Sequence, residues 1–324
     1  MKMKISSISY YLPASIEGLD TLKDDNPEWD IPKIIDKTGI ISRYISAQDE
    51  TAVDMAYAAG VKLLKAVNPE QIDLLILVTQ SPDYVLPTSA CILQDKLGLE
   101  KSCMAFDINL GCSGFVYALS IAGSLIESGV ANSGMIVCSD TYTKYIAKND
   151  RTSRPIFSDG AAAVFVEKSE FDMMGPFAFG TDGSGYDHLI VKEGGSRNTP
   201  AIDQPYGTLH MQGSSVFLFT MTVVPASINK LLDDAAMTLD DVDLVVFHQA
   251  SKLVIDNLIH RLSLDTKKVF TNYSLIGNTV SATIPIALAD ADSQGRLQNG
   301  DNVLLVGFGV GLSWGANLMR WASE

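Results

Sequence analysis

The chain has 324 residues, 47% of them hydrophobic, so it can bury a large core arranged as two domains or two fused halves. Its formal net charge of −14 at pH 7 argues against a nucleic-acid partner, because binding to phosphates needs clustered Lys and Arg. We find no apolar run of the roughly 18 to 20 residues that cross a bilayer, and we therefore expect a soluble protein with no membrane partner.

The four cysteines do not have the pair spacing of a metal site. They are Cys91, Cys103, Cys112 and Cys138. No secretory signal peptide is recognisable before them. We therefore expect reduced thiols, a cytoplasmic location and no bound metal.

Two kinds of segment recur along the chain. Residues 69–80 (PEQIDLLILVTQ) and 239–249 (LDDVDLVVFHQ) share acidic or amide residues, an Asp, an apolar run with β-branched residues and a polar end. Residues 136–166 and 303–321 both predict a strand, a polar turn with glycine, and a second strand. Units of strands and helices that recur in the second half of the chain predict a duplicated α/β domain.

We place the boundary between the two halves near residue 170, giving an N-terminal half of residues 1–170 and a C-terminal half of residues 171–324. The runs LLILV, MIVC, LVVF and VLLVGF are almost wholly apolar, which is typical of sheet covered by helices on both faces. In open α/β sheets, ligands bind at the carboxyl ends of the strands. Polar residues that follow these runs are therefore candidates for a functional site.

Cys112 lies in residues 106–122 (FDINLGCSGFVYALSIA), where a strand is expected to turn abruptly into a helix. Phe106, Ile108 and Leu110 alternate as in a strand, and helical spacing follows the glycines. A thiol at a helix N-terminus meets unpaired N–H groups and a partial positive charge, which favour the nucleophilic thiolate. The alternative interpretation is a small buried core residue.

Two further polar residues stand in similar settings. His248 follows the apolar run of residues 244–247, and Asn278 lies in the segment LIGNTVSATIPIAL ahead of an expected helix. Taken singly, a histidine at a strand end is usually a hydrogen-bonded structural residue, and an asparagine after glycine is a turn residue. Their positions at strand-to-loop transitions predict one pocket that also contains Cys112.

Several motifs resemble β-ketoacyl-acyl carrier protein synthase III, a family of the thiolase-fold superfamily. In order along the chain they are TGIISRYIS, LPTSACILQDKLG, DINLGCSGF, FSDGAAAV, VFHQAS, GNTVSATIPIAL and VGFGVGLSWGANLMRW. The resemblance extends over essentially the whole chain. It implies a thiolase-like fold of two duplicated α/β halves in a layered αβαβα arrangement, and a homodimer.

The resemblance implies a condensing enzyme that acts on thioesters without a metal or redox cofactor. Cys112 would take an acyl group from acyl-CoA or an acyl carrier, and His248 and Asn278 would then bind malonyl-acyl carrier protein. Decarboxylation and Claisen condensation would give a 3-oxoacyl carrier and CO₂, as in fatty-acid biosynthesis. The implied oxyanion donors are the backbone N–H groups of Cys112 and Val310, although family members commonly have glycine at the latter position.

The resemblance also implies binding residues. Arg151 matches a position that contacts the CoA nucleotide, and Lys37 resembles a basic residue near the same tunnel mouth. Leu86 matches a residue that closes the donor acyl pocket of the partner across the dimer interface. Lys252 stands where many members have a carrier-docking Arg, and it offers a point charge instead of a bidentate contact. We expect Trp29 to be a packing residue.

Other functions compete with condensation. The same acyl-cysteine passed to an oxygen or nitrogen nucleophile, without decarboxylation, would make an acyltransferase of a specialised pathway, and transfer to water would make a thioesterase. A catalytically silent protein that only binds acyl carrier protein is a hypothesis of a different class. Asn278 favours condensation, because an amide is no general base but stabilises an enolate. The presence of all three polar residues argues against a silent partner.

Overall fold

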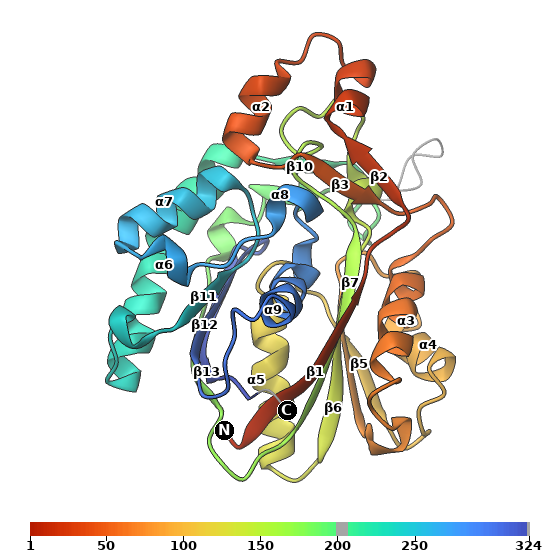
Figure 1. The fold of residues 1–324 in the computed structure, drawn as a ribbon. Helices are drawn as coiled ribbons and strands as arrows, with labels where there is room; N and C mark the ends of the chain where they lie inside the picture. Colours follow the sequence, from red (N-terminus) through yellow and green to blue (C-terminus); the bar gives the residue numbers. More distant parts are fainter. Residues whose placement is uncertain (199–206, 323–324) are drawn as a thin grey trace.

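Two stacked sheets form the framework of the protein in the computed structural model, which describes residues 1–198 and 207–322 (Figure 1). The larger sheet has the strand order β1-β7-β6-β4-β5, and the second has the order β11-β12-β13-β8. The strands of the larger sheet are β1 (Met3–Tyr11), β4 (Leu74–Val78), β5 (Met104–Ile108), β6 (Ser133–Asp140) and β7 (Gly160–Lys168). Those of the second sheet are β8 (Met174–Thr181), β11 (Leu244–Phe247), β12 (Asn302–Gly309) and β13 (Ser313–Arg320).

The remaining elements are helices, short 3₁₀ turns and two small two-stranded sheets. The small sheets pair β2 (Ser15–Gly18) with β3 (Ser42–Ile45), and β9 (Leu189–Val191) with β10 (Leu209–Met211). The helices are α1 (Leu19–Asp25), α2 (Ile31–Thr38), α3 (Ala52–Leu63), α4 (Ser89–Lys96), α5 (Gly114–Glu127), α6 (Gly213–Ala235), α7 (Lys252–Leu262), α8 (Tyr273–Ile276) and α9 (Thr283–Ser293). The 3₁₀ turns are η1 (Pro69–Gln71), η2 (Tyr142–Tyr145), η3 (Gly183–Gly185), η4 (Leu239–Asp241), η5 (Thr266–Lys268) and η6 (Val280–Ala282).

The recurring segments of the sequence form matching parts of the two sheets. The first pair of segments supplies β4 and β11, each preceded by a short 3₁₀ turn. The second pair supplies two antiparallel pairs, β6 with β7 and β12 with β13. In each sheet the first strand runs parallel to the pair, β4 beside β6 and β11 beside β12. The predicted strands are therefore confirmed, and the sheets are mixed.

Helices cover both faces of each sheet, which gives five layers in the order αβαβα (Figure 1). Helices α3 and α4 cover the outer face of the larger sheet, and α6 packs on the outer face of the second sheet with α7 beside it. Helices α5 and α9 lie between the sheets. This arrangement confirms the predicted thiolase-like architecture.

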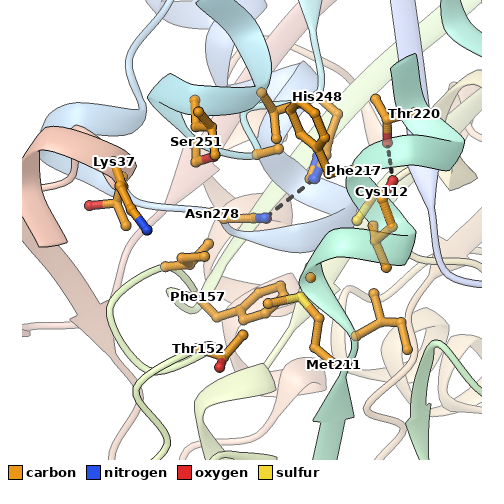
Figure 2. A pocket seen from close by; sticks show the side chains of 18 of the residues that line it. Lys37, Cys112, Thr152, Phe157, Met211, Phe217, Thr220, His248, Ser251 and Asn278 are labelled. Atoms are coloured by element: carbon orange, nitrogen blue, oxygen red, sulfur yellow. Dashed lines mark hydrogen bonds between the residues drawn. The ribbon is translucent and has the colours of Figure 1, made fainter. Parts of the chain in front are cut away.

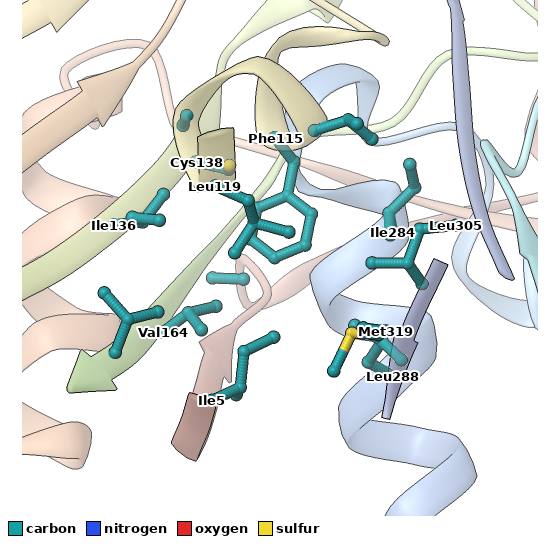
Figure 3. Packing of buried hydrophobic residues seen from close by; sticks show 14 of the residues in the cluster. Ile5, Phe115, Leu119, Ile136, Cys138, Val164, Ile284, Leu288, Leu305 and Met319 are labelled. Atoms are coloured by element: carbon teal, nitrogen blue, oxygen red, sulfur yellow. The ribbon is translucent and has the colours of Figure 1, made fainter. Parts of the chain in front are cut away.

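The central layer is the main hydrophobic core, and both halves of the chain contribute to it. Phe115 of α5 and Leu288 of α9 meet Ile5 and Val164 of the larger sheet, with Leu305 of the second sheet on the far side (Figure 3). Burial of each such side chain contributes about 1.5–3 kcal/mol. Residue 170 lies between β7 and β8, so the strands of the larger sheet all come before it and those of the second sheet all come after it. The two parts of the chain nevertheless share one hydrophobic core.

One described helix has the length and composition of a membrane span, which was not anticipated from the sequence. Helix α6 (Gly213–Ala235) is long and apolar enough to cross a bilayer by length and composition. Its buried residues, among them Met221, Val224 and Ile228, pack instead against the second sheet. The core helix of a soluble protein can have the same length and composition as a membrane span. The packing of α6 against the second sheet therefore accounts for its apolar composition.

Candidate active site

A cavity of about 580 Å³ opens beside the N-terminal part of α6 and contains all three of the predicted catalytic side chains (Figure 2). Cys112, His248 and Asn278 line it and are at most 5% exposed, so they form its inner end. Lys37 and Arg151 also line it but are exposed, so they form its mouth. The structure thus brings residues from both halves of the chain into one site.

Cys112 is held at the turn between β5 and α5 by close packing against glycines. It precedes Ser113, the N-cap residue of α5. A Cβ at Gly309 would stand 2.9 Å from the Cys112 sulfur, and a Cβ at Gly307 would stand 2.6 Å from the Cys112 carbonyl oxygen. Real Cβ atoms do not approach that closely, so β12 needs glycine at both positions for this thiol to fit.

The predicted activation of Cys112 by the helix N-terminus is not what the structure shows. Burial raises the pKa of the Cys112 thiol to about 12, and the nearby carboxylate of Asp140 adds to the increase. The backbone N–H groups of Cys112 and Val310 point at the sulfur and lower the pKa, but by less than burial raises it. The resting thiol is therefore protonated at neutral pH and needs a base to become a nucleophile.

His248 directly follows β11 and is held as a neutral ring. Its backbone N–H donates to the carbonyl of Val306 at 2.8 Å, and its ring packs edge-on against Phe308 with the centroids 5.5 Å apart. Burial lowers the pKa of His248 to about 3. A neutral imidazole has one nitrogen that donates and one that accepts, so its tautomer decides its chemistry.

Hydrogen bonds around the ring define that tautomer. The hydroxyl of Thr283 donates to the carbonyl of Val280 at 3.1 Å, so at 2.7 Å it accepts from Nδ1–H of His248. Nε2 is then unprotonated, and it accepts from the Asn278 amide nitrogen Nδ2 at 3.3 Å (Figure 2). The resting site therefore has an unprotonated ring nitrogen in the same cavity as the buried thiol.

Asn278 is fixed through both its backbone and its side chain. Its N–H donates to the carbonyl of Ile156 at 3.0 Å, and its carbonyl accepts from the N–H of Ser158 at 2.8 Å. Its side-chain oxygen accepts from the N–H of Val280 at 2.9 Å, which turns the NH₂ group toward His248. Val280 has φ of +57°, an unfavourable value for a β-branched residue.

The predicted binding residues are placed differently from one another. Lys37 and Arg151 line the cavity mouth. Lys252 is outside the cavity lining and pairs with Asp256 on the exposed face of α7. Leu86 also lies outside the lining and is 79% exposed in the loop after β4.

Two further residues, Val310 and Trp29, pack against apolar neighbours. The Val310 side chain belongs to the apolar cluster around Cys112, so the residue that stands in place of the family's usual glycine adds a side chain to that wall. Trp29 is 4% exposed and packs with Leu22 and Ile34, as predicted for a packing residue.

Sequence reasoning missed several residues of the site. Thr283, which defines the His248 tautomer, lies inside the motif that identified Asn278. Asp140, beside the thiol, follows the apolar run MIVC, so the rule that found His248 applies to it as well. The cavity wall also includes Phe157 and Met211, which no local pattern distinguishes from ordinary core.

Within residues 1–198 and 207–322, no group of three or more His, Cys, Asp or Glu side chains is arranged to hold a metal ion. The described cysteines are all unpaired, with Cys112 and Cys138 buried. The chemical groups of the cavity include a thiol, an imidazole, a carboxamide, several hydroxyls and the cations of the mouth.

Comparisons with known proteins agree on one family. The family model described as 3-oxoacyl-[acyl-carrier-protein] synthase III matches residues 106–183, and the model of its C-terminal part matches residues 232–321. Proteins named beta-ketoacyl-[acyl-carrier-protein] synthase III from Clostridium perfringens and Clostridioides difficile are similar over nearly their full lengths. The first is 38% identical, covering 98% of this chain and 98% of that protein. The second is 36% identical, covering 99% and 98%.

Solved structures show the same similarity. A crystal structure of a 3-oxoacyl-(acyl-carrier-protein) synthase III superposes with a TM-score of 0.96 at 40% identity, covering 99% of this chain and 100% of that one. A priming β-ketosynthase from the R1128 polyketide biosynthetic pathway superposes with a TM-score of 0.92 at 29% identity, covering 99% and 96%.

Proposed function

Because the chain belongs to the 3-oxoacyl-[acyl-carrier-protein] synthase III family, we propose that it joins an acyl group to a malonyl unit in fatty-acid or related acyl metabolism. The acyl group is taken from acyl-CoA onto Cys112 and condensed with malonyl-acyl carrier protein, giving 3-oxoacyl-acyl carrier protein and CO₂. The observation that carries the proposal is the convergence of Cys112, His248 and Asn278 at the buried end of one cavity with a basic mouth.

Acyl capture begins with removal of the thiol proton. Nε2 of His248 takes the proton of Cys112, and the sulfur attacks the acyl carbonyl carbon. The carbonyl oxygen becomes negative and receives hydrogen bonds from the N–H groups of Cys112 and Val310, which already point at the sulfur. Collapse breaks the bond to the CoA sulfur, which takes the proton from His248. The products are a thioester on Cys112 and free CoA.

Condensation uses the imidazole in its other tautomer. The Thr283 hydroxyl accepts from Nδ1–H or, after rotation, donates to Nδ1, so Nε2 of the neutral ring can carry the proton instead. The malonyl thioester loses CO₂, and the electrons of the broken C–C bond form an enolate. N–H groups of His248 and Asn278 donate to the enolate oxygen.

The enolate carbon then attacks the thioester carbonyl on Cys112. A C–C bond forms, the C–S bond breaks, and the released thiolate takes a proton from water. No step in this sequence requires a metal or redox cofactor. Asn278 acts only as a donor in it, since a carboxamide has no useful proton affinity.

The outer residues are assigned to recognition. Lys37 and Arg151 contact the phosphates of CoA at the mouth, and Lys252 offers a positive charge to the acyl carrier protein. Leu86, exposed in one subunit, closes the donor pocket of the partner in a homodimer. We further assign residues 1–170 and 171–324 to the two duplicated halves, and place the protein in the cytoplasm.

Intact-mass spectrometry with a panel of acyl-CoAs, followed by malonyl-acyl carrier protein, tests the proposal. We expect an acyl adduct on Cys112. The adduct should disappear when malonyl-acyl carrier protein is added, while CO₂ and a 3-oxoacyl carrier are formed. An adduct that persists with malonyl-acyl carrier protein, but whose acyl group is transferred to an alcohol or amine, would instead identify the non-decarboxylating acyltransferase. Absence of any adduct would favour the hypothesis of a catalytically silent protein that only binds acyl carrier protein.

A further inference from the structure

Asp140 is a buried carboxylate beside the site that the proposed mechanism does not use. It is the last residue of β6, and its side chain is completely buried. Ile136 and Cys138 of the same strand face the central layer (Figure 3), and side chains two residues apart share a face. Asp140 therefore points from the larger sheet toward the elements of the C-terminal half.

The two oxygens of this carboxylate bind different halves of the molecule. Oδ1 accepts from the N–H of Gln80 at 2.7 Å and from the Ser81 hydroxyl at 3.3 Å, both in the loop after β4. Oδ2 accepts from the N–H of Ser281 at 3.2 Å and from its hydroxyl at 2.5 Å. Asp140 is thus a bridge between the loop after β4 and η6.

The segment fixed by this bridge carries the donor of the condensation step. Ser281 follows Val280, whose N–H orients the Asn278 side chain and whose φ of +57° is unfavourable. A strained residue persists only where its surroundings hold it in place. The Thr283 hydroxyl bonds to the Val280 carbonyl, and the paired hydrogen bonds from Ser281 to Asp140 fix the next residue to the larger sheet.

We propose that Asp140 is a positioning residue for condensation, holding the Asn278 amide in line with His248 through Ser281. This inference rests on the proposed condensation and adds a residue to it. Asp140 touches neither the thioester nor the reacting atoms. Its effect is to keep one donor aimed at the place where the enolate oxygen forms.

The charge of Asp140 gives the proposal a second, independent signature. The titratable groups that sense it are Cys112, Cys138 and Tyr142, and its carboxylate raises the pKa of each of them further than burial alone. Burial raises the pKa of Asp140 itself to about 6, against the effect of its hydrogen bonds, so it is largely ionised above pH 7. Replacing it with a neutral isostere should therefore lower the pKa of the Cys112 thiol.

The test compares three variants of the full-length protein: Asp140→Asn, Ser281→Ala and the control Ser81→Ala. Ser81 and Ser281 are both buried and both bond to Asp140, but only Ser281 connects it to the Asn278 segment. Three rates are measured for each: acylation of Cys112, release of CO₂ with 3-oxoacyl product, and iodoacetamide alkylation of Cys112 across pH.

We expect Asp140→Asn and Ser281→Ala to slow condensation by roughly 10- to 100-fold while acylation changes little. Ser81→Ala should leave both rates near those of the wild type. Asp140→Asn should move the alkylation profile to lower pH, whereas Ser281→Ala should not, because it keeps the carboxylate. A role in general stability alone would reduce both half-reactions together and leave the alkylation profile in place.

Equal effects of Ser81→Ala and Ser281→Ala on condensation would overturn the proposal, and so would wild-type condensation in Ser281→Ala. The comparison of Ser81→Ala with Ser281→Ala tests the proposal even if Asp140→Asn fails to fold. A wild-type protein that acylates but releases no CO₂ from malonyl carrier would refute the proposed function itself, a result distinct from either of these.

Discussion

The inner end and the mouth of the cavity are built in opposite ways. At the inner end, the side chains of His248 and Asn278 are buried and hydrogen-bonded to neighbouring groups, and Cys112 is packed against glycines. At the mouth, Lys37 and Arg151 are exposed, and within the described part of the chain no ion pair holds either side chain. Under the proposed function, the inner end is preorganised for chemistry and the mouth can adapt to the substrate. Changes at the inner end should therefore alter kcat, and changes at the mouth should alter KM.

The largest effect is expected at the nucleophile. Cys112→Ala removes the nucleophilic thiol from the cavity and should abolish acyl-enzyme formation, while malonyl decarboxylation continues at a reduced rate. Intact mass after incubation with acyl-CoA reports the first activity, and CO₂ release the second. Cys91→Ala, at an exposed cysteine, is the matched control and should keep the adduct.

Asn278→Ala should separate the two half-reactions. We expect acyl transfer to Cys112 to remain largely intact and condensation to fall by about 10² to 10³, the effect of removing one oxyanion donor. Single-turnover assays of each half-reaction measure the difference. If both fall equally, the amide does not act at the enolate, and the assignment of separate roles is wrong.

Thr283→Val should have a smaller effect on both half-reactions. Valine has nearly the shape of threonine but leaves Nδ1 of the buried His248 without a partner, so we expect a loss of about tenfold in kcat with KM unchanged. Thr220→Val is the control. Thr220 also lines the cavity, but its hydroxyl bonds only to the Val216 carbonyl of its own helix, at 2.9 Å.

The smallest effect is expected at the mouth. Arg151→Ala should raise KM for acyl-CoA by about tenfold, the scale of one hydrogen bond to a charged group, with kcat preserved. The same variant should behave like the wild type with an acyl-pantetheine donor, which lacks the nucleotide. A loss of kcat with both donors would show that the mouth also shapes the inner end.

Much of the fold and the three central residues were predictable because they depend on local pattern. The apolar runs that became β4, β6, β11 and β12 are continuous, and Cys112, His248 and Asn278 each interrupt or follow apolar sequence. Polar residues in such places are conspicuous in a sequence, and the topology of α/β sheets brings strand ends together.

Properties that depend on packing from a distance were not predictable. The thiol pKa of Cys112 was expected to be low from its position before α5, but burial by elements of both halves raises it. The composition of α6 did not reveal that a sheet covers its apolar face. Asp140 was missed because its role depends on Ser281, which lies 141 residues away along the chain.

The shared central layer has a consequence for how the protein is made. Helix α5 needs the larger sheet on one side and α9 with the second sheet on the other, and the latter elements come from residues 174–320. While the ribosome has released only the first half, the second apolar face of α5 has no partner and is exposed to other chains. Completion of the core waits for the end of translation, so truncated products should aggregate instead of folding as stable halves.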